Sequence, residues 1–352
     1  ETVSVFNTLQ KGYLKLNKDE IIALINFDKV EEILKANKNT ALNNLSTKQV
    51  RSNSFFDDFD QKEEVKIEEN DKELKISLEI KPNDVIGKYK IIKKIGQGAT
   101  SIVYLCHHNI LELDFAMKML DINSIENESQ MQDIFLMEVK TTAKLRHENL
   151  VRVIDAEINK NHTYIIMEYI DGDSLNEILN KFNTINEVNS AKIAIEVCKA
   201  LAYSLSKGII HRDIKPANIM ITKTPSIKVT DFGLAKVIDH NQIYTSKSGT
   251  VNGSPYYMSP EQYRDCNSID HRSDMYSLGV TLYEMIAGSL PFKGDHIIEV
   301  MNKHFGETPP TLYDLGKSSQ KCSDIVMKLL EKNPDKRYSN YSYLVEDLMT
   351  IL

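Results

Sequence analysis

A polar segment near the middle of this chain constrains its fold and its chemistry more than any other feature. His211-Arg212-Asp213-Ile214-Lys215-Pro216-Ala217-Asn218 follows the apolar residues Gly208-Ile209-Ile210 and carries five polar residues in eight positions. Asp231-Phe232-Gly233 lies 18 residues beyond Asp213. Asp213, Asn218 and Asp231 supply the oxygen atoms that Mg²⁺ binding and phosphoryl chemistry need, so the pattern indicates a site for such chemistry.

A glycine turn lies upstream, between two stretches of alternating apolar residues. Gly96 and Gly98 stand in a G-x-G-x-x-S pattern between the predicted strands 89–95 and 102–105. Glycine lets the backbone approach phosphate oxygens, which main-chain N–H groups can then bind. An ordinary hairpin turn explains the same residues. Because no helix follows the turn, it does not fit a dinucleotide-binding fingerprint.

One lysine interrupts an apolar strand further along. Lys118 stands in Phe115-Ala116-Met117-Lys118-Met119-Leu120, and Glu138 lies in a downstream helical pattern. A lysine that faces a core is costly unless it is paired, and Glu138 is a possible partner. The alternative is an edge-strand lysine whose ammonium group reaches solvent.

Composition and charge exclude several classes of function. The 352 residues carry 43 Lys and Arg against 50 Asp and Glu, a net charge of −7, which argues against nucleic-acid binding and a polybasic membrane anchor. No apolar run approaches the ~20 residues that span a bilayer, and no secretory signal is visible. The four cysteines, Cys106, Cys198, Cys266 and Cys322, are scattered, which predicts reduced and mostly buried thiols in a cytoplasmic protein. The first residue is Glu, so a membrane anchor beyond either end stays open.

The organisation of the chain changes at about residue 85. Residues 1–85 form a predicted extension, with an amphipathic helix over about 17–36 and an acidic linker over about 55–73. Strand patterns follow first and helical patterns later, which predicts an α+β domain of two lobes over 86–352.

Taken together, the motifs resemble the signature set of protein kinases in order and spacing. The set comprises the glycine loop, Ala116-x-Lys118, Glu138, the 211–218 segment, Asp231-Phe232-Gly233 and Ser259-Pro260-Glu261. The resemblance covers about residues 89–352 and is closest to Hanks-type Ser/Thr protein kinases, with bacterial members suggested by Ser-Pro-Glu-Gln. It implies the bilobal protein kinase fold. A small β-rich N-lobe with one regulatory helix would span about 86–167, and a large, mainly helical C-lobe about 171–352.

The resemblance also implies ATP and Mg²⁺ as cofactors. Lys118 would hold the α- and β-phosphates and pair with Glu138. Met167 would be the gatekeeper beside the adenine. The nucleotide site would consist of the glycine loop, the side chains around the adenine and the backbone beyond the gatekeeper: Gly96, Gly98, Val103, Ala116, Lys118, Met167, Glu168, Ile170 and Met220.

The implied catalytic roles fall on the polar segment. Asp213 would orient the substrate hydroxyl and accept its proton, and Lys215 would neutralise the transferring phosphoryl group. Asn218 and Asp231 would hold Mg²⁺. Because Lys215 is followed by Pro216, the segment favours serine and threonine substrates over tyrosine.

Three further residues have implied structural roles, and three positions depart from the family pattern. Glu261 and Arg337 resemble the family's buried ion pair, and Asp274 should bond the backbone of the catalytic loop. Ser101 replaces the third glycine, Tyr276 replaces a usual tryptophan and Ser259 replaces alanine. None of these departures removes a chemical group.

Regulation is expected in the loop between Asp231 and Glu261. By resemblance, Arg212 receives a phosphate from this loop, and Thr250, four residues before Ser254, matches the usual activating position. The other hydroxyl residues there are Tyr244, Thr245, Ser246 and Ser248. A phosphate at Thr250 would gain charge-assisted bonds to Arg212. The alternative is a merely polar loop.

The extension carries an aromatic motif, Phe56-Asp57-Asp58-Phe59-Asp60. It resembles the hydrophobic motif that docks beside the regulatory helix in some kinases, in cis or in trans. Exposing these phenylalanines is unfavourable, although a disordered linker with incidental aromatics is the simpler interpretation.

The sequence therefore predicts an ATP- and Mg²⁺-dependent kinase that phosphorylates Ser and Thr in protein substrates, its own activation loop included. A homodimer for trans-autophosphorylation is a further expectation. The alternatives are a catalytically weak pseudokinase that acts as a scaffold or allosteric partner and, less favoured, a small-molecule phosphotransferase.

Overall fold

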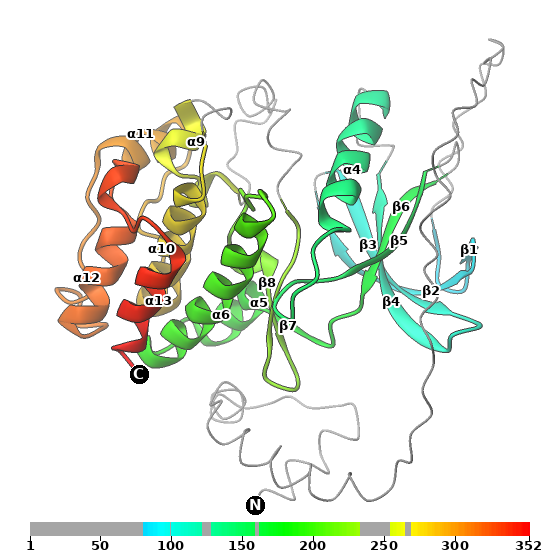
Figure 1. The fold of residues 1–352 in the computed structure, drawn as a ribbon, viewed down its shortest axis with the longest axis horizontal. Helices are drawn as coiled ribbons and strands as arrows, with labels where there is room; N and C mark the ends of the chain where they lie inside the picture. The colour runs from blue at the N-terminus through cyan, green and yellow to red at the C-terminus, as the bar shows by residue number, and fades with distance from the viewer. Residues whose placement is uncertain (1–79, 99, 122–127, 159–161, 233–253, 265–268) are drawn as a thin grey trace, which may run out of the picture. The chain divides into compact units, whose positions relative to one another are not determined.

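In a computed structural model of the chain, six strands form one antiparallel sheet (Figure 1). Their order in the sheet is β1-β2-β3-β4-β6-β5. The bounds are β1 Val85–Ile86, β2 Tyr89–Gln97, β3 Ser101–His108, β4 Leu113–Leu120, β5 Val153–Ile158 and β6 Thr163–Glu168. The two expected strands around the glycine turn correspond to β2 and β3.

The structure describes residues 80–98, 100–121, 128–158, 162–232, 254–264 and 269–352. The described residues from Lys81 onward belong to one compact unit. The helix expected over 17–36, the acidic linker, Phe56 and Phe59 lie outside these ranges.

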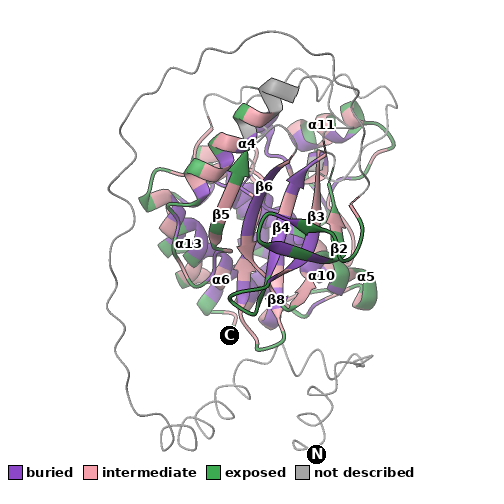
Figure 2. Cartoon of the chain, turned by 90° about the vertical axis from the view of Figure 1, so that its right-hand side faces the viewer, coloured by how far each residue is buried: buried purple, intermediate pink, exposed green. Residues whose placement is uncertain are grey.

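Strand β4 runs through the interior of the sheet, between β3 and β6. Six of its eight residues are apolar, and five of them are buried (Figure 2). Val103 and Ile165 stand opposite Lys118 on the two neighbouring strands. Lys118 is therefore not on an edge strand, which rules out the interpretation of a lysine that reaches solvent from a sheet edge.

One long helix, α4 (Glu128–Thr142), accompanies this sheet. Its Phe135 is buried with Leu120 and Ile165, and Val139 packs against the same cluster. This apolar contact sets the position of α4 against the sheet, and with it the position of Glu138 one residue before Val139.

A second, three-stranded sheet follows, with the order β7 (Gly172–Ser174), β8 (Ile219–Thr222) and β9 (Ile227–Val229). Gly172 permits a close approach of β7 to β8, because a Cβ atom there would lie 2.1 Å from the carbonyl oxygen of Ile221. Ala at this position would therefore clash with the backbone.

The rest of the described chain is mainly helical. Helix α5 (Leu175–Phe182) begins with a capping box between Ser174 and Glu177, and α6 (Glu187–Ser206) begins at Asn186. The later elements are η2 Pro216–Asn218, η3 Ser254–Tyr257, α9 Pro260–Arg264, α10 Arg272–Ala287, α11 Ile297–Gly306, α12 Gln320–Leu329, η4 Pro334–Lys336 and α13 Tyr341–Met349. The helices of this part begin at Leu175, close to the start of the predicted helical lobe at about residue 171.

The helical part has its own core around α6 and α10. Helix α10 buries thirteen of its sixteen residues, including Tyr276 at the position of the expected tryptophan.

Cys106, Cys198 and Cys322 are free and buried, as expected. Among the described helices, none is both long and apolar enough to cross a bilayer. Strands first and helices later make up the predicted α+β, two-lobed architecture.

Candidate active site

Three charged side chains from distant parts of the chain meet in the candidate site. The Nζ atom of Lys118 lies 2.7 Å from Oε1 of Glu138 and 2.8 Å from Oδ1 of Asp231. Lys118 comes from β4 and Glu138 from α4, whereas Asp231 follows β9. The lysine therefore joins the six-stranded sheet and its helix to the helical part of the chain.

The charges of this three-residue cluster act against the effect of burial on Lys118 and Asp231. Burial alone would lower the pKa of Lys118, but the carboxylates of Asp231 and Glu138 raise it above its ordinary value. Burial would raise the pKa of Asp231, but the ammonium group of Lys118 holds it below its ordinary value. Lys118 and Asp231 are therefore both charged, which suits the binding of phosphate groups and of a metal ion.

The catalytic-loop residues form a second cluster. Lys215 donates to Oδ2 of Asp213 over 2.8 Å, and Nδ2 of Asn218 donates to the Asp213 carbonyl oxygen over 2.8 Å and to Oδ2 over 3.1 Å. The side chains of Lys215 and Asp213 are mostly buried. These contacts fix one carboxylate orientation, which a proton acceptor requires.

The backbone before Asp213 is held by Asp274 of α10. The Asp274 carboxylate accepts from the N–H of His211 over 2.8 Å and from that of Arg212 over 2.7 Å. Burial raises the pKa of Asp274 to about 7, although both N–H bonds favour its charged form. The expected bond between Asp274 and the loop backbone is present in this geometry.

His211 links the catalytic loop to the segment that contains Asp231. Its Nε2 atom lies 3.0 Å from the Thr230 carbonyl oxygen and therefore carries the proton, while Nδ1 accepts from the N–H of Asp213 over 3.3 Å. Its ring lies 4.5 Å from that of Phe232. This fully buried imidazole thus couples the backbone positions of Asp213 and Asp231.

The residues expected around a nucleotide lie on the strands that surround Lys118. Gly96 stands opposite Val103 of β3, one residue before the pairing of β2 ends at Gln97. Gly98 closes the turn by donating to the carbonyl oxygen of Ser101 over 2.7 Å. Ala116 lies two residues before Lys118 on β4, and Met220 lies on β8.

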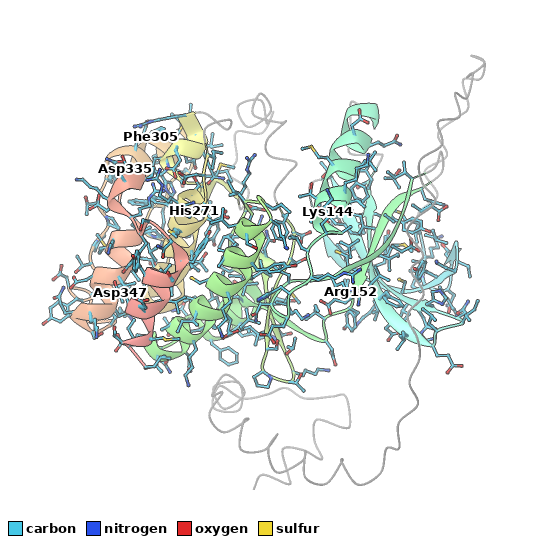
Figure 3. The ribbon with its side chains drawn as sticks, viewed as in Figure 1. Lys144, Arg152, His271, Phe305, Asp335 and Asp347 are labelled. Atoms are coloured by element: carbon cyan, nitrogen blue, oxygen red, sulfur yellow. The ribbon has the colours of Figure 1, made fainter. Side chains whose placement is uncertain are left out.

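The expected gatekeeper and hinge residues end strand β6. Met167 stands opposite Ala116 and packs against the cluster of Leu120, Phe135 and Ile165. The N–H of Glu168 donates to the carbonyl oxygen of Arg152 over 3.0 Å; Figure 3 labels Arg152. Because the N–H of Glu168 is used there, a contact from its backbone to an adenine would use the carbonyl oxygen. Ile170 lies two residues further on.

Glu261 and Arg337 form a two-pronged ion pair. The two guanidinium nitrogens lie 2.6 and 2.9 Å from the two carboxylate oxygens, and the Arg337 side chain is fully buried. Burial would raise the pKa of Glu261, but Arg337 holds it below its ordinary value. Arg337 also donates to three carbonyl oxygens, so it ties α9 to the chain before α13.

The loop between Asp231 and Glu261 is described only in part. Ser254 begins η3. The expected phosphate acceptors Tyr244, Thr245, Ser246, Ser248 and Thr250 lie outside the described residues.

Two contacts of the site were not expected from the sequence. Lys228 of β9 lies 2.7 Å from Oε1 of Glu168, which links the hinge to the second sheet. Gln262 donates to the carbonyl oxygen of Arg212 over 3.0 Å. Ser259 followed three residues later by Gln262 is a capping-box pattern. The sequence therefore signals the bonds between Ser259 and Gln262, but not the bond from Gln262 to Arg212.

The oxygen atoms at the site suit a magnesium ion. Asn218 donates through Nδ2, which turns Oδ1 away from Asp213, and Asp231 interacts electrostatically with Asp213. Within the described ranges, no group of three or more His, Cys, Asp or Glu side chains could hold a metal ion. Asn218 and Asp231 could hold Mg²⁺ as a partial ligand set, because this ion commonly takes one or two protein ligands together with water and phosphate oxygens.

Comparison with known proteins identifies the family. The model of the protein kinase domain matches residues 89–349. The chain therefore belongs to the protein kinase family, and its predicted fold is confirmed.

Named relatives and solved structures agree with this assignment. A probable serine/threonine-protein kinase of Clostridium perfringens is 35% identical over 265 residues, which cover 75% of this chain and 38% of that protein. The serine/threonine-protein kinase PknB of Mycobacterium tuberculosis is 35% identical over 276 residues, which cover 77% of this chain and 44% of that protein. The PknI kinase domain of M. tuberculosis superposes with a TM-score of 0.62 at 22% identity, covering 78% of this chain and 99% of that domain. The chain thus spans about two fifths of the length of these two curated relatives.

Proposed function

We propose that this chain transfers the γ-phosphoryl group of ATP to serine and threonine hydroxyls of protein substrates. The observation that carries the proposal is the joining of Lys118 to both Glu138 and Asp231 beside a fixed Asp213. The named relatives are Ser/Thr protein kinases, which supports the substrate class. A pseudokinase would be expected to lack one of these groups, and all of them are present.

In the proposed reaction, the substrate hydroxyl attacks the γ-phosphorus while the bond to the ADP oxygen breaks. The hydroxyl proton passes to the Asp213 carboxylate, and Lys215 stabilises the charge on the transferring group. Lys118 holds the α- and β-phosphates. Because every step is a matter of position and charge, no covalent nucleophile is needed.

Mg²⁺ is the proposed cofactor, and Asn218 and Asp231 would hold it. When bound, it would neutralise charge on the β- and γ-phosphates. The ion pair of Asp231 with Lys118 keeps the carboxylate ionised, and the bonds from Asn218 to Asp213 keep its amide oriented.

The glycine loop supports a nucleotide at this place. A Cβ atom at Gly96 or Gly98 would meet only ordinary contacts at 3.5 Å or more, and neither residue has a left-handed backbone. The fold itself therefore does not require glycine there. Close approach to phosphates explains the two glycines, with the adenine between Val103, Ala116 and Met220 and against Met167 and the backbone of Glu168 and Ile170.

Regulation through the activation loop belongs to the same proposal. A phosphate on Thr250, or on the neighbouring Thr245, Ser246 or Ser248, would pair with the guanidinium group of Arg212. We expect autophosphorylation between two copies of the chain, and Thr250→Ala to lower activity.

Residues 1–85 are proposed to be a regulatory extension of the kinase domain at 86–352, with Phe56 and Phe59 as a docking motif in cis or in trans. The cytoplasm is the proposed location. Two features support this location. ATP is the proposed phosphoryl donor, and the three described cysteines are free thiols, as is usual in reducing compartments.

Phosphoamino-acid analysis tests the proposed substrate class. The chain is incubated with Mg-ATP labelled at the γ-phosphate, a mixed protein substrate and a panel of small alcohols. Phosphoserine and phosphothreonine are expected. Phosphotyrosine alone, or label only in the small alcohols, would contradict the proposal.

A further inference from the structure

We propose that Gln262 is a positioning residue for phosphoryl transfer, acting through the peptide that joins Arg212 to Asp213. The inference rests on the proposed function and deepens it. Gln262 follows the Ser-Pro-Glu motif on α9 and is 50 residues away from Arg212 in the chain. Its side chain is buried.

The backbone at Arg212 has a conformation that needs external support. Its φ angle is 67°, in the left-handed region that residues other than glycine rarely adopt. Such a conformation is unfavourable and persists only where neighbouring groups determine it. Asp274 supplies part of that support by accepting from the N–H of Arg212.

The next peptide unit leads directly into Asp213, and two groups hold its two ends. Gln262 Nε2 donates to the Arg212 carbonyl oxygen over 3.0 Å, and the N–H of Asp213 donates to His211 Nδ1 over 3.3 Å. A peptide plane held at both its oxygen and its N–H cannot rotate. The position of the Asp213 Cα atom is therefore restrained, and with it the point from which its side chain extends.

The orientation of the Gln262 amide follows from its partners. Its Oε1 atom accepts from the N–H of Ser259 over 3.0 Å and from the Ser259 hydroxyl over 3.2 Å. If the amide were flipped, Oε1 would face the carbonyl oxygen of Arg212, which is also an acceptor. Nε2 would then face the N–H and the hydroxyl of Ser259, which are donors. The acceptor half therefore belongs to the cap of α9, and the donor half to the catalytic loop.

Gln262 thus connects the substrate side of the site to its catalytic side. Helix α9 follows η3, which begins at Ser254, the small hydroxyl residue of the substrate-docking loop by resemblance to the family, and Tyr263 beside Gln262 bonds the carbonyl oxygen of Pro255. A single buried amide thereby sets the distance between the substrate-docking segment and the proposed proton acceptor Asp213.

Two substitutions at position 262 and one control separate positioning from folding. Gln262→Met keeps the side-chain volume and removes both the hydrogen-bond donor and the acceptor of the amide. Gln262→Glu keeps an acceptor oxygen and loses the donor at neutral pH. Ser259→Ala weakens the cap and leaves the donor half in place. We expect kcat to fall roughly 10- to 50-fold in both Gln262 variants, with KM for ATP within about twofold of the unaltered chain.

The control variant Ser259→Ala should keep kcat within about twofold. A kcat within about twofold in both Gln262 variants would overturn the proposal, and so would an equal loss in Ser259→Ala.

Amide hydrogen exchange gives a readout that does not depend on activity. In Gln262→Glu and Gln262→Met, the amides of Arg212 and Asp213 should exchange about tenfold faster, while in Ser259→Ala the increase should be confined to α9. If the unaltered chain transfers no phosphate, the proposed function fails, and the exchange rates still decide whether Gln262 holds the loop. Unchanged exchange at Arg212 and Asp213 would overturn the positioning role even in an active enzyme.

Discussion

Lys118 and Asp231 are 113 residues apart in the chain, yet the Nζ atom of Lys118 lies 2.8 Å from Oδ1 of Asp231. The same ammonium group bonds Glu138 over 2.7 Å. A buried charged lysine is stable only when an oppositely charged partner lies close to it. This arrangement holds Lys118, the proposed phosphate-binding residue, next to Asp231, the proposed metal ligand.

Replacing Lys118 tests this arrangement directly. Lys118→Met leaves the buried Glu138 carboxylate and the partly exposed Asp231 carboxylate without their cation, and it removes the proposed phosphate contact. We expect kcat/KM for ATP to fall at least about 100-fold. Steady-state kinetics with a protein substrate measure the loss.

The control for Lys118 is Lys223→Met. Lys223 also pairs with an aspartate, Asp171, over 2.8 Å, but both of these side chains are more than half exposed. Activity should stay within about twofold, because exposed ion pairs contribute little. An equal loss in both variants would show that general destabilisation, and not the site, explains the effect at Lys118.

The glycine loop and Gly172 should respond to alanine in opposite ways. Gly98→Ala adds a methyl group that the fold accommodates at 3.5 Å, so stability should not change, while KM for ATP rises roughly tenfold because the phosphates are displaced. Gly172→Ala meets the carbonyl oxygen of Ile221 at 2.1 Å and should lower the melting temperature. Thermal unfolding and ATP titration on both variants measure the two effects. A drop in stability for Gly98→Ala with unchanged KM would oppose the nucleotide role of the loop.

The ion pair of Glu261 and Arg337 should contribute strongly to folding. Arg337→Ala leaves the Glu261 carboxylate and three carbonyl oxygens without their donor, and we expect the free energy of unfolding to fall by about 3–5 kcal/mol. Lys181→Ala, which breaks an exposed pair with Asp173, should cost less than about 1 kcal/mol. Urea denaturation followed by circular dichroism measures the free energy of unfolding of both variants. Similar losses in the two would contradict a strong contribution of the buried ion pair to folding.

The buried His304 predicts a pH dependence of stability. Its Nδ1 atom lies 2.9 Å from the Tyr276 hydroxyl, and burial together with the ammonium group of Lys332 lowers its pKa to about 3. The unfolded imidazole takes up a proton near pH 6.5, whereas the folded one resists it. Stability from neutral His304 is therefore complete above pH 6.5 and is lost as the pH falls toward 3.

Denaturation at several pH values tests the direction of this pH dependence. Between pH 6.5 and pH 5, the chain should lose about 2 kcal/mol more unfolding free energy than His304→Gln, which keeps a polar side chain and does not titrate. A steeper pH dependence in His304→Gln would mean that the folded histidine is charged.

Short motifs made much of this site predictable, because residues close in the chain carry the catalytic loop. Asp213, Lys215 and Asn218 lie within six positions, and the resemblance supplied their distant partners Lys118, Glu138 and Asp231. The left-handed backbone of Arg212 carries no sequence signal, since it is imposed by Asp274 and Gln262 from other helices. The direct bond of Lys118 to Asp231 and that of Lys228 to Glu168 likewise depend on tertiary packing, which one sequence does not encode in any local pattern.

The most direct test of the central claim compares the chain with Asp213→Asn. This substitution keeps the shape of the side chain and removes the proton acceptor. Both proteins are incubated with Mg-ATP and a protein substrate, ATP binding is measured by calorimetry, and phosphosites are mapped by mass spectrometry. The account predicts that both bind ATP and that only the unaltered chain phosphorylates Ser and Thr, on the substrate and within residues 244–250. ATP binding without transfer in the unaltered chain, or undiminished transfer in Asp213→Asn, would contradict it.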